Sequence, residues 1–189
     1  MAILIAHSVP ILAGIWGASE VLLMLFRRSA PGSSQDRNSL RLIWLADFVG
    51  IFGAIYAARR LDRWMFLAHE NFLLAALVIF AIGIVLRVYS ISWLGKFFTA
   101  NVAIAADHEL IDNGPYRLVR HPSYTGALLT FLGFGLSFGN IASLLILLVP
   151  VCAAFLWRIH VEEQALLGAF GERYRAYMKK TKRLVPGIY

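Results

Sequence analysis

The chain has almost no cysteine and few charged side chains. Cys152 is the single cysteine among 189 residues, so an intramolecular disulfide and a cysteine-based metal site are both excluded. Charged residues make up 15% of the chain, whereas soluble domains carry about 25%. Hydrophobic residues make up 59%, above the roughly 45–50% of soluble domains. These proportions favour an integral membrane protein, and the absence of a Gly/Ser-rich linker predicts one domain over residues 1–189.

Several common functional signatures are also missing. The sequence contains no P-loop, no GxGxxG fingerprint and no pattern typical of a Ser-His-Asp triad. Its five histidines are not spaced like metal ligands, so no metal is expected. The net charge of +7 comes from basic residues beside apolar segments. Such an arrangement favours membrane lipids with anionic headgroups, and not nucleic acid, as the partner.

Long apolar runs predict the fold. Residues 2–26 lack the basic start and the cleavage site of a secretory signal, so they are expected to remain as a transmembrane helix. A crossing needs about 20 apolar residues. The candidate runs are 3–26, 42–58, 71–94, 125–138 and 141–158. We therefore expect an all-α, multi-pass transmembrane helical bundle of about five spans, in which the short fourth run forms a tight hairpin with the fifth.

The basic loops predict the orientation. Lys and Arg are concentrated in the segments 27–41 and 95–121 and in the tail after the last apolar run, whereas the opposite side carries three arginines. Lys/Arg-rich loops stay in the cytoplasm, so the N-terminus is expected outside and the C-terminus inside. Residues 161–182 have apolar positions at helical spacing with basic residues between them. This pattern predicts an amphipathic helix on the cytoplasmic face.

Two polar segments stand at helix ends. One surrounds Pro122, which is expected to start the fourth helix and to place His121 and Tyr124 at its first turn, where anions are favoured. The other holds Arg158 and Glu162, which project from one helix face. An interfacial histidine and a surface ion pair worth about 0.3–0.5 kcal/mol stay open as interpretations, but polar groups at membrane depth favour a ligand site. Three further ionisable residues lie inside the apolar runs and are weaker candidates: Glu20, Asp47 and Arg87.

Together, these segments resemble a known family. The matching residues are Asp107-His108-Glu109-Leu110-Ile111, Gly114-Pro115-Tyr116, Arg120-His121-Pro122-Ser123-Tyr124-Thr125-Gly126, Arg158, Glu162-Glu163, Phe170-Gly171, Tyr174, Tyr177 and Pro186. This ensemble is similar to the isoprenylcysteine carboxyl methyltransferase family, which belongs with the membrane phospholipid methyltransferases. The resemblance covers roughly residues 90–189, whereas the first three spans match only as generic apolar helices.

The resemblance implies a membrane enzyme that transfers a methyl group from S-adenosyl-L-methionine to a lipid-borne carboxylate, such as the α-carboxyl group of a prenylcysteine. The apolar runs predict three spans within residues 1–94, and the resemblance implies a cofactor-binding and catalytic half within 95–189, with a pocket facing the cytoplasm. Arg158 is implied as the acceptor-binding residue, and Arg158 with Glu162 as the catalytic pair. Carried over by position, the cofactor-binding residues are Asn101, His108, Glu109, Leu110, Ile111, Tyr116, His121, Pro122, Ser123, Tyr124 and Glu162.

The residue types suit this chemistry. Arg158 has the geometry to hold a carboxylate, which is ionised at neutral pH and needs no general base. Glu162 suits the ammonium group or the ribose of the cofactor, and His121 and Tyr124 at a helix N-terminus suit its methionyl carboxylate. Three alternatives stay open: methylation of a phospholipid amine, methylation of an amphipathic phenol, and a non-catalytic membrane scaffold.

Overall fold

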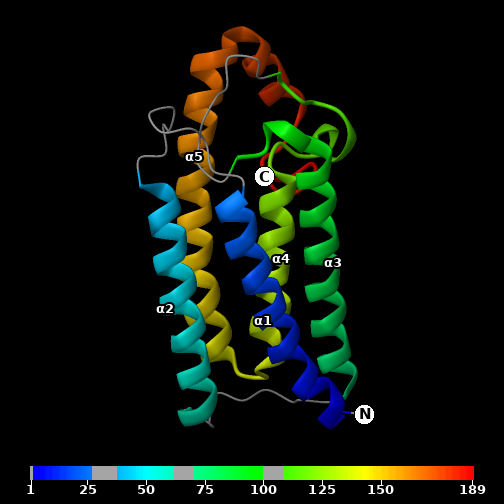
Figure 1. Cartoon of the computed structure of the whole chain (residues 1–189), viewed down its shortest axis with the longest axis vertical. Coiled ribbons are helices and arrows are strands. Elements are labelled where there is room, and N and C mark those ends of the chain that lie inside the picture. Colours follow the sequence, from blue (N-terminus) through cyan, green and yellow to red (C-terminus); the bar gives the residue numbers. More distant parts are fainter. Residues whose placement is uncertain (1, 27–37, 62–69, 100–108) are drawn as a thin grey trace.

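The computed structural model describes residues 2–26, 38–61, 70–99 and 109–189, which form a bundle of α-helices (Figure 1). The elements are α1 (Ala2–Phe26), α2 (Ser39–Arg60), α3 (Glu70–Leu94), the 3-10 helices η2 (Gly95–Phe97) and η3 (Gly114–Arg117), α4 (Pro122–Ser137) and α5 (Ile141–Lys180). Within these ranges, β pairing is limited to an isolated bridge between Val119 and Lys182. The predicted all-α class is confirmed.

The helices can be compared with the thickness of a bilayer by their length and composition. Within the described residues, three helical stretches are long and apolar enough to cross a membrane: Ser39–Arg60, Phe72–Phe97 and Ile141–Lys180. In α1, a helix of 25 residues, the stretch Ile11–Leu23 is also apolar. α4 has 16 residues and a length of about 24 Å, below the roughly 30 Å of a hydrocarbon core. The helical membrane fold is confirmed, and the number of five crossings stays a prediction.

The short α4 is held between neighbours. It passes into α5 through a turn in which Gly139 has a φ of 60°. Asn140 caps α5, since its Oδ1 accepts a hydrogen bond from Ser143 N at 3.1 Å, and its Nδ2 donates to Leu61 O at the end of α2 at 2.9 Å. Figure 1 shows α3 beside α4 and α2 beside α5. The expected hairpin is therefore present, and two longer helices flank it.

A seam of glycines brings α3 and α4 into backbone contact. A Cβ atom at Gly83 would lie 2.4 Å from Thr130 N, and one at Gly133 would lie 2.4 Å from Phe80 N. Small residues allow such close approach between membrane helices, whose association depends on van der Waals packing. The seam fixes the register of α4 against α3. It thereby fixes the position of Pro122, where the polar residues gather.

α5 continues past the end of the apolar run and is kinked at Gly171. Its 40 residues form two helical parts, because the backbone departs from helical angles at Gly171, where φ is 50° and ψ is −123°. The segment 161–182, predicted as one amphipathic helix, is helical up to Lys180, but the kink at Gly171 divides it. Its apolar side differs from the prediction, because Tyr174 and Tyr177 are buried against Leu110 of the same chain and do not lie on a membrane surface.

Replacing Gly133 by alanine should destabilise the bundle, because the added Cβ meets backbone atoms of α3. Overpacking of this kind costs about 1–3 kcal/mol. The matched control is Gly14→Ala in α1, where an added Cβ has no atom within 4 Å and alanine gains up to about 1 kcal/mol of helix propensity. Thermal unfolding of both variants in detergent measures the difference. Equal midpoints would contradict a tight contact between α3 and α4.

Candidate active site

A buried carboxylate joins three parts of the chain. Glu163 on α5 is 2% exposed. Its Oε1 accepts a hydrogen bond from Arg120 Nε at 2.9 Å, and its Oε2 accepts two from Arg183 at 2.7 and 3.0 Å. His121 Nε2 lies 3.4 Å from Oε1. A buried charge is tolerated when it is paired and hydrogen-bonded, and through these contacts Glu163 holds the start of α4 and the C-terminal segment against α5.

The C-terminal segment is attached at the same place through its backbone. Arg120 N donates to Lys182 O at 2.8 Å, and His121 N donates to Arg183 O at 3.0 Å. The Arg120 guanidinium also donates to carbonyl groups at the end of α5. Hydrogen bonds to Glu163 raise the pKa of Arg183 above its usual range. An arginine is a cation in any case, and these contacts make Arg183 a fixed counter-charge of Glu163.

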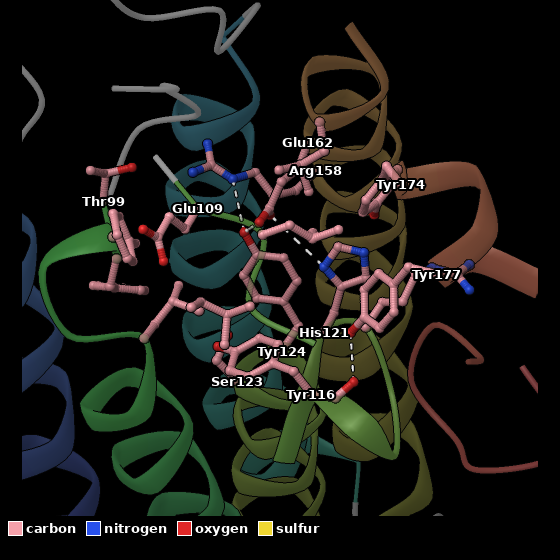
Figure 2. Close-up of a pocket in the computed structure, with 17 residues that line it drawn as sticks. Thr99, Glu109, Tyr116, His121, Ser123, Tyr124, Arg158, Glu162, Tyr174 and Tyr177 are labelled. Carbon is pink, nitrogen blue, oxygen red and sulfur yellow. Dashed lines mark hydrogen bonds and ion pairs between the residues drawn. The ribbon is translucent and has the colours of Figure 1, made fainter. Parts of the chain in front are cut away.

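Arg158 and Glu162 meet the start of α4 through one phenol. The Tyr124 hydroxyl donates to Glu162 Oε2 at 2.6 Å and accepts from Arg158 Nε at 3.2 Å (Figure 2). Arg158 is 3% exposed, and its Nη1 donates to Ser39 Oγ on α2 at 3.0 Å. The His121 ring stacks on Tyr124 with 5.6 Å between the ring centroids. The two polar segments of the sequence therefore form one cluster.

This cluster forms one wall of a pocket of about 810 Å³ that is partly open to solvent. Every sequence-predicted site residue that the structure describes lines the pocket except Pro122, which is the first residue of α4. The predicted residues that line it are Glu109, Leu110, Ile111, Tyr116, His121, Ser123, Tyr124, Arg158 and Glu162. Asn101 and His108, also predicted, lie outside the described residues.

The pocket has further walls that sequence reasoning did not assign: Leu94, Phe97, Phe98, Thr99, Arg120, Leu166, Tyr174 and Tyr177. Tyr177 donates its hydroxyl to Tyr116 O at 2.6 Å, which ties the end of α5 to η3. Burial raises the pKa of Tyr116 above its ordinary value, so the phenol stays protonated and donates to Ser90 O at 3.3 Å. The family pattern already contained Tyr174 and Tyr177, and that was the signal available for them. Residues 94–99 carry no comparable motif.

A second cavity, of about 920 Å³ and partly open to solvent, is lined by residues of α1, α2, α3, α4 and α5. Its walls are mostly apolar and include Trp16, Gly17, Leu23, Leu40, Ile43, Trp44, Ile51, Ala127, Phe131 and Phe155. Phe98, Thr99, Tyr124 and Arg158 line both cavities. The polar pocket and the apolar cavity therefore meet at the guanidinium and the phenol just described.

The three ionisable residues of the apolar runs also line the second cavity. Arg87 donates through two nitrogens to both carboxylate oxygens of Glu20, and through Nη1 to Ser123 O at 3.3 Å. This ion pair supports the first turn of α4. Asp47 Oδ1 is buried and has no hydrogen-bond partner among the described residues.

The sequence is similar to known methyltransferases. A family model described as phospholipid methyltransferase matches residues 72–173. The protein-S-isoprenylcysteine O-methyltransferase of Schizosaccharomyces pombe is 30% identical over 167 residues, which cover 80% of this chain and 70% of that protein. Protein-S-isoprenylcysteine O-methyltransferase B of Arabidopsis thaliana is 33% identical over 114 residues, which cover 59% of this chain and 58% of that protein.

A solved structure is also similar. It is that of the eukaryotic intramembrane Ras methyltransferase, an isoprenylcysteine carboxyl methyltransferase, with a TM-score of 0.61 and 25% identity over 77% of this chain and 52% of that chain. This chain thus spans between about half and 70% of the length of these relatives. The matched family region contains the start of α4 and the polar part of α5.

Replacing Glu163 by glutamine should destabilise the fold strongly, because Arg120 and Arg183 lose their shared counter-charge. Removing one partner of a buried ion pair costs about 3–5 kcal/mol. The matched control is Glu172→Gln on the surface of α5, where both partners of the pair with Arg175 are more than half exposed and a loss below about 1 kcal/mol is expected. Unfolding in detergent measures the loss of stability in each of the two variants. Equal losses would show that Glu163 is not a central contact.

Proposed function

This chain belongs to the phospholipid methyltransferase family, and on that premise we propose that it transfers a methyl group from S-adenosyl-L-methionine to the carboxylate of a lipid-borne acceptor such as a prenylcysteine. The observation that carries the proposal is the junction of two cavities at Arg158 and Tyr124. One cavity is rich in polar groups, and the other is mostly apolar. A donor from water and an acceptor from lipid need such a pair of connected spaces.

The polar pocket fits the parts of the cofactor. When bound, S-adenosyl-L-methionine supplies a methyl group that is already activated by a sulfonium. Glu162 would hold the ammonium group or the ribose hydroxyls, because a carboxylate accepts hydrogen bonds from both. His121 stands at the N-terminus of α4, where a carboxylate of the ligand is favoured. Leu110 and Leu166 offer apolar surface for the purine.

The apolar cavity suits a hydrocarbon tail. Burying a lipid chain gains about 0.8 kcal/mol per CH₂, so a long-chain acceptor stays in the bilayer. Its carboxylate would meet Arg158, whose planar guanidinium matches a carboxylate with two parallel hydrogen bonds. Contacts with Ser39 and Tyr124 hold this guanidinium in place. Binding of the acceptor therefore costs less side-chain entropy than binding to a mobile arginine would.

Methyl transfer to a carboxylate needs alignment and no acid–base catalyst. The carboxylate oxygen forms a bond to the methyl carbon while the carbon–sulfur bond breaks, and the electron pair of that bond stays on sulfur. An anion and a sulfonium become an ester and a thioether, and no proton moves. Because opposite charges are neutralised along this path, exclusion of water favours it. Holding both reactants in line supplies much of the rate gain.

The polar pocket is proposed to face the cytoplasm. It lies toward the end of the bundle at which α5 bends and the C-terminus lies (Figure 1). Lys179 and Lys180 in the last turn of α5 add positive charge at that end. Basic segments beside spans favour the cytoplasmic side, which is also the side where a soluble cofactor is found.

A phospholipid amine is the second candidate acceptor, and Asp47 is the observation that favours it. Its carboxylate lines the apolar cavity, and one of its oxygens lacks a hydrogen-bond partner within the described ranges, which would suit a protonated amine. However, Asp47 follows Ser39 by two helical turns of α2, about 12 Å along the axis. Arg158 contacts Ser39 itself. The charged group at the junction of the cavities is therefore a cation, which favours a carboxylate acceptor.

The purified protein should bind S-adenosyl-L-homocysteine with saturable heat in calorimetry. Glu162→Ala should weaken this binding at least about tenfold, since hydrogen bonds to charged groups contribute about 1.5–3 kcal/mol. Glu172→Ala, an exposed acid on the same helix, should bind like the wild type. Absence of heat with the wild type would favour the non-catalytic scaffold over an enzyme.

Arg158→Ala should keep the affinity for S-adenosyl-L-homocysteine and lower methyl transfer to a prenylcysteine by about 10- to 100-fold, the loss of one charge-assisted contact. The control is Arg59→Ala, an exposed arginine in the last turn of α2 that lines neither cavity. Turnover is measured with a prenylcysteine, a fatty acid and phosphatidylethanolamine. Unchanged turnover in Arg158→Ala, or a preference of the wild type for phosphatidylethanolamine, would refute the carboxylate assignment.

A further inference from the structure

Tyr174 carries a buried hydroxyl that the described fold leaves without a hydrogen bond. The residue is 1% exposed, and its hydroxyl has no partner among the residues that the structure describes. Leaving such a group unpaired costs about 1–3 kcal/mol, and buried polar groups are nearly always satisfied. Phenylalanine would fill the same space without this cost. Because Tyr174 lines the polar pocket, a ligand in that pocket is the natural partner.

The surroundings of Tyr174 indicate which part of a ligand it meets. Its ring packs with Leu110 and Tyr177, and Leu166 and Phe170 lie against this cluster. The side chains of this cluster are apolar or aromatic, and the charged groups nearest to Tyr174 are Glu162, Glu163 and Arg120. Flat heteroaromatic ligands bind between apolar side chains, and a few polar groups fix their orientation. The ring nitrogens of adenine are hydrogen-bond acceptors, and a phenol is a donor.

We propose that the Tyr174 hydroxyl donates a hydrogen bond to the adenine of the bound cofactor and so selects for the nucleoside; this inference rests on the function proposed above. Gly171 supports the arrangement, because its φ of 50° bends α5 just before Tyr174. An added Cβ at Gly171 would meet no atom within 4 Å, so the glycine is required for its backbone angles. Figure 2 shows Tyr174 and Tyr177 on the same side of the pocket, next to His121.

Tyr177 provides a matched comparison one helical turn further along. Its hydroxyl donates to Tyr116 O at 2.6 Å, so it contributes to the ligand-free fold. The Tyr174 hydroxyl has no such partner among the described residues. Removal of the two hydroxyls should therefore have opposite effects on the ligand-free protein, which separates a ligand contact from a structural one.

The experiment compares the full-length wild type, Tyr174→Phe and Tyr177→Phe in detergent. Calorimetry measures binding of S-adenosyl-L-homocysteine and of 5′-methylthioadenosine, which keeps the nucleoside and lacks the amino-acid part. Tyr174→Phe should weaken both ligands by the same factor, about three- to tenfold for one neutral hydrogen bond. The thermal midpoint of ligand-free Tyr174→Phe should equal or exceed that of the wild type, whereas Tyr177→Phe should lower it.

Equal affinity of Tyr174→Phe and the wild type for S-adenosyl-L-homocysteine would overturn the inference. A loss confined to S-adenosyl-L-homocysteine, or no binding of 5′-methylthioadenosine to the wild type, would overturn the assignment to the nucleoside. A lowered midpoint of ligand-free Tyr174→Phe would also overturn it, because the hydroxyl would then have a structural partner. If the wild type binds neither ligand, the proposed function fails, and this inference fails with it.

Discussion

The contact between Glu163 and its cations is the interaction on which the polar half of this protein depends. Arg120 and His121 come from the start of α4, and Arg183 comes from the segment after α5. At these residues, neither the start of α4 nor the segment after α5 is held by a sheet or by packing between long helices. Ion pairs and hydrogen bonds therefore set the positions of both segments. Glu162 is the next residue around the helix, about 100° away, and it faces the pocket. Glu163 thus has a structural role, whereas Glu162 is the acid that we propose to bind the cofactor.

The same arrangement explains how a membrane bundle can contain so many polar groups. Charged side chains are costly at membrane depth unless they pair or line a cavity. In this protein they do both. The ion pair of Glu20 and Arg87 and the group around Tyr124 border the two cavities, and the glycine seam between α3 and α4 keeps the helix that carries Tyr124 in register. The packing of apolar helices therefore positions the polar side chains.

Much of this architecture could be predicted from the sequence, for identifiable reasons. A membrane span requires a long apolar run, which located most helices, and proline fits the first position of a helix, which located the start of α4. The family pattern supplied the pocket residues. The central place of Glu163 could not be predicted, because which of two adjacent acids is buried depends on the rotation of α5. The apolar cavity could not be predicted from the sequence either. It forms between helices that are distant in the sequence, and its size depends on how tightly they pack.

The backbone contacts between residues 182–183 and the start of α4 limit which substitutions the C-terminal segment can accept during evolution. The last residues are not an interchangeable tail, because Arg183 supplies a cation to an acid twenty positions earlier in the sequence. A chimera that takes its C-terminal segment from a relative would keep the fold of this region only if a basic side chain arrived at the same place. Substitutions at Glu163 and Arg183 are therefore coupled, and a lineage that changes one of them has to compensate at the other.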